Sequence, residues 1–386
     1  MAEPGSGAGQ TLGVYVHVPF CARRCDYCAF ATWAGLNHLA RPYVGACLTE
    51  LQRAYDGGLG PAATVFFGGG TPSQLPGDEL VRLLDGIHRE EGAEVTVECN
   101  PEDVTARLLG TYAAAGVTRI SLGVQSLAPH VLANLGRRHN PEAVARAVAA
   151  IGQAGFDSFS VDLIYGARNE TDHDWETTLQ KVLSLDPPPP HLSAYALQAE
   201  PGTPLWRDPD RHPDDDAQAR RYETAEAVLE EAGLGWYEIS NWSRPGHECR
   251  HNQNYWRQGE YLGVGCAAHS HLGGRRFWNL RSPERYMAAI ASNRSAVAGE
   301  ERLDSDHRLL ESLELAVRTR EGVEADALPD DEMLAGLVAR DRGRAVLTLR
   351  GRLLANEVAC RLRVPADAAR HDNGQFHPRP VWVGDR

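Results

Sequence analysis

The stretch YVHVPFCARRCDYCAF, residues 15–30, decides the fold of this chain. Residues 15–18 are an apolar run typical of a strand, and Pro19 ends it. Three cysteines follow with the spacing C-x3-C-x2-C: Cys21, Cys25 and Cys28. Gaps of four and three residues let their sulfurs converge on one point from a single loop. Three thiols this close, in a chain without an export signal, predict a metal centre rather than disulfides.

The kind of metal centre is open between an iron–sulfur cluster and zinc. A four-iron, four-sulfur (4Fe–4S) cluster usually takes four cysteine ligands, so three thiolates would leave one iron open. Zinc would need a fourth ligand, for which His17 is the candidate. If residues 15–18 form a strand, His17 points away from the alternate residues. We therefore favour the cluster.

Composition and charge exclude several classes of protein. The chain has 386 residues, enough for more than one domain, and is 42% hydrophobic and 24% charged. Its net charge of −13 argues against broad nucleic-acid binding. No apolar run is long enough to cross a bilayer, and the first ten residues lack the features of a secretory signal. We expect a cytoplasmic protein and leave peripheral membrane contact open. The remaining cysteines are expected to be buried structural thiols: Cys47, Cys99, Cys249, Cys266 and Cys360.

Strands and helices are expected to alternate along the first half of the chain. Apolar runs predict strands at residues 14–18, 64–67, 94–99, 119–124, 158–164 and 191–197. Helical spacing predicts helices at residues 41–54, 78–89, 105–115, 141–154 and 175–185. Six such units predict a parallel sheet, either barrel-like or doubly wound. Ligands collect at the carboxyl ends of the strands in these sheets.

The pattern changes after residue 200. A helix is expected at residues 217–232, and further helices at 307–318 and 330–340. Short strands are expected at residues 345–349 and 353–354, which together suggest a small helical, winged-helix-like domain. The domain boundaries we predict are a disordered lead-in at 1–11, a core at 12–240, a linking region at 241–303, a C-terminal domain at 304–364 and a tail at 365–386.

Glycine and polar residues stand where the expected strands end. The run 68–70 exposes backbone groups and allows a ligand to approach closely, although alone it is also typical of a turn. Glu98 ends the third strand, where a carboxylate can accept hydrogen bonds from two ribose hydroxyls. Gln125 and Asp162 lie at the ends of the fourth and fifth strands, and Arg137 lies in LGRRH. Each of these alone could be a solvated surface residue.

The cysteine spacing, with an aromatic residue before the third cysteine, resembles the radical S-adenosylmethionine (SAM) enzymes. With FFGGGTP, VECNPE, RISLGVQS and VDLIYG, it resembles the subfamily related to oxygen-independent coproporphyrinogen III oxidase. The resemblance implies an α/β fold, an open (β/α)6 partial TIM barrel, and a 4Fe–4S cluster whose open iron holds SAM. It also implies a set of SAM-binding residues: Tyr15, Gly69, Gly70, Thr71, Glu98, Gln125, Arg137 and Asp162.

The subfamily contains decarboxylating oxidases and haem-binding chaperones of the HemW type. The oxidases resemble C-x3-C-x2-C-x-C, with a fourth cysteine where this chain has Phe30, and they carry an N-terminal arm longer than the lead-in here. Residues 251–256, HNQNYW, match the HNxxYW motif of the chaperone branch. A neutral imidazole is a common axial ligand of haem iron, so the resemblance implies His251 as the ligand. Tyr255 and Trp256 would cover the macrocycle.

Two histidines near this motif, His247 and His269, are rival ligands, and the motif alone is equally consistent with an imidazole that caps a turn. The chain also departs from the family after the fifth strand, where it reads YGARNET and the family usually has YGLPGQT. Ala167, Arg168 and Asn169 replace a stiff turn with a charged one.

The sequence therefore predicts a haem chaperone with a 4Fe–4S cluster, SAM and haem as cofactors. By the resemblance, haem-accepting respiratory enzymes are its partners, with a homodimer left open and nucleic acid excluded. The first alternative is oxygen-independent coproporphyrinogen III oxidase, which yields protoporphyrinogen IX, so whether the chain is an enzyme stays open. The second alternative is a zinc-stabilised nucleic-acid-binding protein.

Overall fold

The computed structural model describes residues 11–364, and the lead-in and the tail expected at the two ends fall almost wholly outside this range. Six parallel strands form the centre of one sheet and follow chain order across it. They are β1 (Leu12–Val18), β4 (Ala62–Gly69), β5 (Arg89–Cys99), β6 (Arg119–Gln125), β7 (Ser158–Tyr165) and β8 (His191–Ala196). All six predicted strands are confirmed, with small changes in length.

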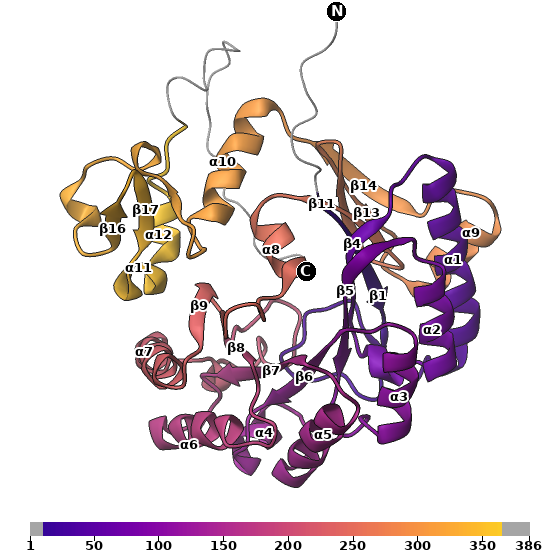
Figure 1. Ribbon diagram of the computed structural model, residues 1–386, viewed down its shortest axis with the longest axis horizontal. Helices are drawn as coiled ribbons and strands as arrows, with labels where there is room; N and C mark the ends of the chain where they lie inside the picture. The colour runs from indigo at the N-terminus through magenta and orange to yellow at the C-terminus, as the bar shows by residue number, and fades with distance from the viewer. Residues whose placement is uncertain (1–10, 365–386) are drawn as a thin grey trace, which may run out of the picture.

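Helices follow the strands and cover the outer side of the sheet (Figure 1). They are α1 (Ala40–Asp56), α2 (Gly77–Asp85), α3 (Ala106–Ala114), α4 (Pro129–Asn134), α5 (Pro141–Gln153), α6 (Asp172–Leu183) and α7 (Asp215–Glu231). The prediction that the second helix reaches residue 89 is wrong. Gly86 ends it, and Arg89 already pairs with Ala62 as the first residue of β5.

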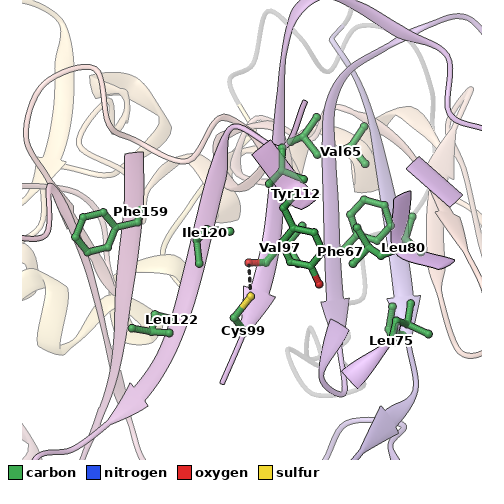
Figure 2. Packing of buried hydrophobic residues seen from close by; sticks show 14 of the residues in the cluster. Val65, Phe67, Leu75, Leu80, Val97, Cys99, Tyr112, Ile120, Leu122 and Phe159 are labelled. Carbon is green, nitrogen blue, oxygen red and sulfur yellow. Dashed lines mark hydrogen bonds between the residues drawn. The ribbon is translucent and has the colours of Figure 1, made fainter. Parts of the chain in front are cut away.

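Alternation along each strand separates an apolar face from a polar one. Val65 and Phe67 of β4, with Val97 of β5, point outward into the main core, where they meet Leu80 and Tyr112 of the helices (Figure 2). Successive side chains of a strand point to opposite faces, so the intervening residues face the concave side. Those residues include many polar ones: His17, Thr64, Glu94, Thr96, Glu98, Arg119, Ser121, Ser160, Asp162, His191 and Ser193. The outer face of the barrel strands, under the helices, is therefore apolar, and the inner face carries many polar side chains.

Further strands extend the sheet on both sides. Beyond β8 lies β10 (Asn241–Ser243), which is antiparallel to β8, and then β9 (Gly235–Glu238), which is antiparallel to β10. Beyond β1 lies β11 (Glu260–Val264), which is parallel to it, followed by antiparallel β12 (His269–Leu272), β13 (Arg275–Asn279) and β14 (Val297–Arg302). Strands β14 and β9 are the two edges of the sheet, so the barrel is open. Residues 241–303, expected to link two domains, thus supply five strands of this sheet together with α8 (Arg250–Trp256) and α9 (Pro283–Ala291).

The last described part has a hydrophobic core of its own, built around Val317, Val323 and Val358. Its elements are α10 (Ser305–Ala316), β15 (Val323–Glu324), β16 (Val338–Asp341), β17 (Arg344–Leu347), α11 (Leu349–Leu353) and α12 (Ala355–Ala359). Figure 1 shows most of these elements, in yellow, to one side of the barrel. The buried Arg352 connects the two parts through an ion pair with Glu226 of α7 at 2.5 Å.

Two predictions for this part are wrong. The helix expected at residues 330–340 is a single 3-10 turn, Glu332–Leu334, after which the chain enters β16. Arg342 and Gly343, both with positive φ, form the turn that pairs β16 with β17. The strand expected at residues 353–354 lies at the end of α11, whose N-cap Thr348 accepts a hydrogen bond from the amide of Gly351. In the part of the chain that the structure describes, no helix has the length and apolar character needed to span a membrane.

Candidate functional site

The cysteine loop leaves the carboxyl end of β1 through β2 (Phe20–Cys21) and returns at β3 (Trp33–Ala34), which pairs with it. Cys21 is buried, and Cys25 and Cys28 are half-buried. Burial raises the pKa of Cys21 and of Cys28, and the nearby thiols raise both further. The hydroxyl of Thr32 lowers the pKa of both. The loop gathers three thiols, and metal binding would deprotonate them.

The glycine run at the end of β4 lies directly against the carboxyl end of β1, where the cysteine loop begins. Gly69 has φ +107°, and a Cβ there would lie 2.4 Å from Nδ1 of His17. A Cβ at Gly70 would lie 2.7 Å from the carbonyl oxygen of Val18, to which the Gly70 amide donates. Only glycine permits this close approach. The crossing brings the hydroxyl of Thr71 to 3.5 Å from Cys21 Sγ.

A chain of hydrogen bonds joins the first cysteine to the second. Asn100 Nδ2 donates to Thr71 Oγ1 at 3.4 Å, and Asn100 Oδ1 accepts from Arg137 Nη2 at 2.6 Å. The same Nη2 donates to the carbonyl of Gly123 at 2.9 Å, while Nη1 lies 3.8 Å from Cys25 Sγ. The guanidinium is therefore held in one orientation near the sulfur of Cys25.

Asn100 is part of this network although the sequence analysis did not select it. The signal was its position, since it directly follows Cys99, the last residue of β5, and lies two residues after Glu98. Gln125 is also placed here: it has φ +64°, and a Cβ at Gly123 would lie 3.0 Å from its Nε2 and 3.7 Å from Arg137 Nη2. Polar groups from three strand ends thus meet beside the thiols.

Glu98 lies on the concave face beside Tyr15. A Cβ at Gly68 would lie 3.2 Å from Glu98 Oε2 and 3.1 Å from the Tyr15 ring, so the lack of a side chain at Gly68 lets both side chains pack closely against β4. Burial, with the nearby charge of Asp162, raises the pKa of Glu98 to about 8, although the Gly69 amide opposes this. A carboxyl in this state can exchange a proton near neutral pH.

Asp162 is held differently. Ser121 Oγ donates to one carboxylate oxygen at 2.6 Å, and Ser193 Oγ donates to the other at 2.8 Å. Ser160 Oγ donates in turn to Ser121 Oγ at 2.9 Å. Burial raises the pKa of Asp162 although these serines lower it. Both oxygens of Asp162 are therefore already bonded inside the barrel.

The donors around the thiols fit a cluster better than zinc. His17, the expected fourth zinc ligand, has Nε2 at 2.9 Å from the carbonyl of Ala31 and Nδ1 at 3.3 Å from the hydroxyl of Tyr15. Burial lowers the pKa of His17 to about 4. Within residues 11–364, no group of three or more His, Cys, Asp or Glu side chains is arranged around a single metal ion. Three thiols with Thr71 and Arg137 against their sulfurs suit a larger, multi-iron group.

Comparison with known proteins agrees with this site. The profile described as Radical SAM superfamily matches residues 15–182. The chain is 43% identical over 370 residues to the heme chaperone HemW of Mycobacterium tuberculosis (strain CDC 1551 / Oshkosh), covering 91% of this chain and 94% of that protein. It belongs to the HemW family. It is also 40% identical over 265 residues to the heme chaperone HemW of Escherichia coli (strain K12), covering 67% of this chain and 69% of that protein.

The fold of this HemW-family chain is similar to that of a radical SAM enzyme of known structure. Coproporphyrinogen III oxidase (HemN) from Escherichia coli matches with a TM-score of 0.80 and 23% identity, over 91% of this chain and 89% of that one. At this identity the likeness concerns the fold, which confirms the open barrel predicted from the sequence.

The HNQNYW segment of this HemW-family chain forms α8, at the opposite end of the strands from the cysteines. A Cβ at Gly13 would lie 3.1 Å from Cε1 of His251, and Gly13 is five residues, roughly 16 Å of strand, from Val18. His251 is 1% exposed, with Nδ1 at 2.8 Å from Thr64 Oγ1 and Nε2 at 2.9 Å from the hydroxyl of Tyr255. Both ring nitrogens are thus bonded, and the imidazole stacks on a phenylalanine, Phe66.

The other residues that the sequence suggested for haem binding differ in their surroundings. Tyr255 lies edge-on to Tyr261 at 4.6 Å between ring centroids, and Trp256 is half-buried. His247 is half-buried, with Nδ1 at 3.3 Å from Ser158 Oγ. His269, in contrast, is exposed.

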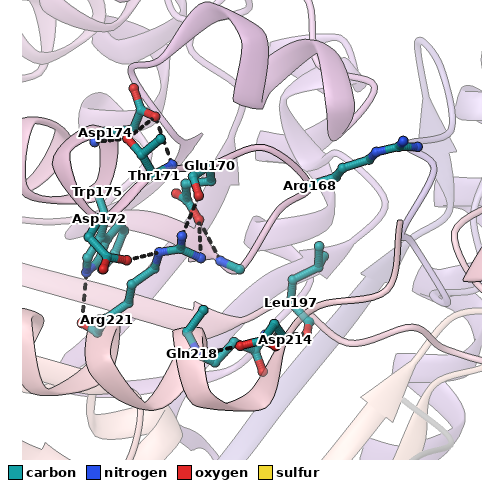
Figure 3. A network of polar contacts seen from close by, with 12 residues as sticks. Arg168, Glu170, Thr171, Asp172, Asp174, Trp175, Leu197, Asp214, Gln218 and Arg221 are labelled. Atoms are coloured by element: carbon teal, nitrogen blue, oxygen red, sulfur yellow. Dashed lines mark hydrogen bonds and ion pairs between the residues drawn. The ribbon is translucent and has the colours of Figure 1, made fainter. Parts of the chain in front are cut away.

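The loop in which this chain departs from its family is firmly held (Figure 3). Asn169 has φ +59°, and Ala167 is buried in an apolar cluster. Glu170 accepts a hydrogen bond from the Gly166 amide at 2.6 Å and pairs with the buried Arg221 of α7 at 3.4 Å. The turn is therefore anchored by the ion pair of Glu170, the residue that follows Asn169.

The scattered cysteines are buried as expected, with one exception. Cys47, Cys99, Cys249 and Cys266 are buried, whereas Cys360 is exposed just beyond α12, so the prediction for Cys360 is wrong.

Proposed function

We propose that this chain is a haem chaperone, which binds haem and delivers it to haem-dependent respiratory proteins. The observation that carries this proposal is the 43% identity, along nine-tenths of the chain, to a curated protein named heme chaperone HemW. Both the barrel and the C-terminal domain lie within that alignment, so the likeness is not limited to a single motif.

A 4Fe–4S cluster and SAM belong to the same proposal. Cys21, Cys25 and Cys28 are the proposed cluster ligands, and a bound cluster supplies electrons to SAM at its open iron. Arg137 places a cation near the Cys25 sulfur, and the hydroxyl of Thr71 lowers the pKa of Cys21. The residues proposed to hold SAM are Tyr15, Gly69, Gly70, Thr71, Glu98, Gln125, Arg137 and Asp162.

The structure supports unequal roles within this SAM set. Glu98 lies near the carboxyl end of β5 beside Tyr15, and a carboxylate there is suited to accept hydrogen bonds from ribose hydroxyls. Asp162 has both oxygens bonded to serines, so we infer that it shapes the wall of the site and stabilises it. Asn100 joins the set as the residue that positions Arg137.

Decarboxylation of coproporphyrinogen III is the less supported alternative. Phe30 occupies the position of the fourth cysteine of the oxidases, and its side chain is 47% exposed. The similarity to HemN concerns the fold, which many activities share. We therefore place haem transfer ahead of oxidation.

The setting that we propose is the cytoplasm, with peripheral contact at the membrane where respiratory acceptors lie. A net charge of −13 is unfavourable for nucleic acid, which makes the zinc-stabilised nucleic-acid-binding alternative the weakest. A homodimer is compatible with the proposal.

The test is anaerobic purification followed by metal analysis and titration with haem. We expect about four irons and four sulfides per chain, a paramagnetic signal after reduction, and a Soret band as haem binds. Absence of any Soret change would contradict the chaperone proposal. Release of carbon dioxide from coproporphyrinogen III, with SAM and a reductant, would favour the oxidase instead.

A further inference from the structure

Three arginines in the described part of the chain are buried, and one of them lacks a carboxylate partner. Arg119, Arg221 and Arg352 are 2%, 5% and 5% exposed. Arg221 pairs with Glu170, and Arg352 pairs with Glu226. Arg119 forms no ion pair with any described residue. A buried cation without an anion is unfavourable, because burial removes water and no opposite charge replaces it.

Neutral partners use only part of the hydrogen-bonding capacity of Arg119. Its Nη1 donates to Ser158 Oγ at 2.7 Å and to the carbonyl oxygen of His247 at 2.9 Å. The other terminal nitrogen, Nη2, is buried and has no hydrogen-bond partner within the described range. The first set of bonds fixes the guanidinium, and Nη2 keeps two N–H groups that suit a carboxylate oxygen.

Arg119 lines a cavity of about 390 Å³ beside the amino-terminal parts of β5, β6 and β7. Arg119 and Ser158 are the first residues of β6 and β7 and pair with each other in the sheet. The lining also includes Thr118 and Gly246, which are exposed, so a ligand can enter from solvent. A cavity of this size accommodates a small molecule or one end of a larger one.

The two carboxylates that border this cavity already have other partners. Glu94 accepts hydrogen bonds from two backbone amides at the start of α8. Glu248 accepts one from the Gly246 amide at 2.9 Å and pairs with Arg320 at 3.2 Å. Neither carboxylate forms an ion pair with Arg119, so the charge of Arg119 has no direct counterpart in the cavity wall.

A second cation borders the cavity. Arg250, the first residue of α8, is exposed, and its Nη1 donates to the carbonyl oxygen of Gly92 at 3.0 Å. Gln253, one turn further along α8, adds a neutral amide to the same wall. Two guanidinium groups and an amide around one cavity complement an anionic group of a ligand.

We propose that this cavity binds the carboxylate of a small-molecule ligand, with Arg119 as the residue that binds it and Arg250 as the cation at the entrance. Two sources present this chemistry: a haem propionate, and a free dicarboxylate. The haem source rests on the proposed function. It would place a propionate next to α8, which carries the HNQNYW segment.

The experiment compares the wild-type full chain with Arg119→Met and Arg250→Gln. Arg146→Met, on the exposed side of α5, is the control. Each protein is titrated with haem and with haem dimethyl ester, in which the propionates are esterified, while the absorption spectrum is followed. Succinate is the third probe, with binding measured by isothermal titration calorimetry.

We expect Arg119→Met to weaken binding of the carboxylate probe about tenfold, because a charge-assisted hydrogen bond is lost. Arg250→Gln should have a smaller effect, about threefold, since solvent screens an exposed cation. Arg146→Met should match the wild type. A wild-type preference for haem over its ester that disappears in Arg119→Met identifies the propionate as the ligand, and Arg119-dependent binding of succinate alone identifies a free carboxylate.

Equal affinities of folded Arg119→Met and the wild type for all three probes would overturn the inference and leave the chaperone proposal intact. If the wild type binds no haem, the proposed function fails, whereas succinate still tests the cavity. Absence of succinate binding as well would then overturn the inference. Circular dichroism checks that each variant is folded. If Arg119→Met does not fold, Arg119→Lys replaces it, and wild-type affinity for each probe in that variant would also contradict the role of the guanidinium.

Discussion

The two ends of the barrel use the same residue types in opposite ways. At the carboxyl end, the hydroxyl of Thr71 lies near the Cys21 sulfur and the guanidinium of Arg137 lies near the Cys25 sulfur. At the amino end, α8 closes the barrel, and His251 is bonded through both nitrogens. A functional group with spare bonding capacity can bind, whereas one whose capacity is used stabilises the fold. The comparison indicates that residue type alone does not separate these roles.

Two glutamates of β5 make this contrast on one strand. Glu94 and Glu98 are four residues apart and face the same side. Glu94 accepts from the backbone amides of Arg250 and His251, at 3.1 and 3.0 Å, and so anchors the start of α8. Glu98 has the Gly69 amide as its one favourable partner among the causes of its pKa shift, and burial raises its pKa to about 8. The position along the strand therefore determines whether the carboxylate anchors α8, as Glu94 does, or lies at the carboxyl end of the barrel, as Glu98 does.

The largest expected effect comes from removing one of the three thiols at the carboxyl end of the barrel. Changing Cys21, Cys25 or Cys28 singly to Ser should reduce bound iron and sulfide to background, because two thiolates cannot hold the cluster in place. Metal analysis after anaerobic reconstitution measures this. Cys360→Ser is the matched control, since that thiol is exposed and lies in the C-terminal domain. A Cys25→Ser protein with full iron content would contradict the proposal that the three thiols hold the cluster.

A second change sharpens the comparison by leaving the cluster in place. Arg137→Gln removes the cation bonded to Asn100, Gly123 and near Cys25. A lost charge-assisted hydrogen bond costs about 2 kcal/mol, so SAM affinity should fall roughly thirtyfold. Isothermal titration with SAM on the iron-loaded protein measures it.

Arg138→Gln, next in the chain, should leave SAM affinity unchanged. Equal affinity in Arg137→Gln and the wild type would show that Arg137 supports the loop and does not meet the ligand.

The third change tests whether the hydrogen bond between Thr64 and His251, at the amino end of the barrel, stabilises the fold. Thr64→Val keeps the shape of the side chain and removes the hydroxyl bonded to His251. A buried nitrogen left without a partner costs about 1 to 2 kcal/mol, which urea unfolding of the apoprotein measures. The matched variant Thr49→Val, on the exposed side of α1, should cost far less. If Thr64→Val is neutral, α8 does not depend on the His251 bond.

The smallest expected effect is the change of stability with pH that follows from the raised pKa of Glu98. Its folded pKa of about 8 lies above the usual carboxyl value of 4.5, so the unfolded chain loses its proton first as pH rises. The stability of the wild type should therefore fall relative to Glu98→Gln between about pH 4.5 and 8, and level off above pH 8. Urea unfolding of both proteins at pH 5 and pH 8 measures the difference. Glu98 is partly exposed, so solvent screens the penalty and keeps it small. A difference that is the same at both pH values would contradict the raised pKa.

Local pattern was sufficient for the central fold and for much of the carboxyl-end site. Alternating apolar residues identified all six parallel strands because each buries one face under a helix. Cysteine spacing and the glycine run placed Cys21 and Thr71 at neighbouring strand ends, and the structure brings them together. The C-terminal helix at 330–340 was mispredicted, because the two-residue turn at Arg342 and Gly343 outweighed helical spacing.

The sequence by itself determined the thiol centre, the order of the barrel strands and which face of each strand is buried, because these depend on neighbours only a few residues apart. Tertiary structure alone decided that Gly13 pairs with Tyr261, a contact across 248 positions that local spacing cannot encode. That pairing extends the concave face to His269 and sends α8 to the far end of the barrel. Whether an imidazole is buried or exposed depends on residues distant in the chain, and so His251 and His269 look alike in sequence but His251 is buried and His269 is exposed.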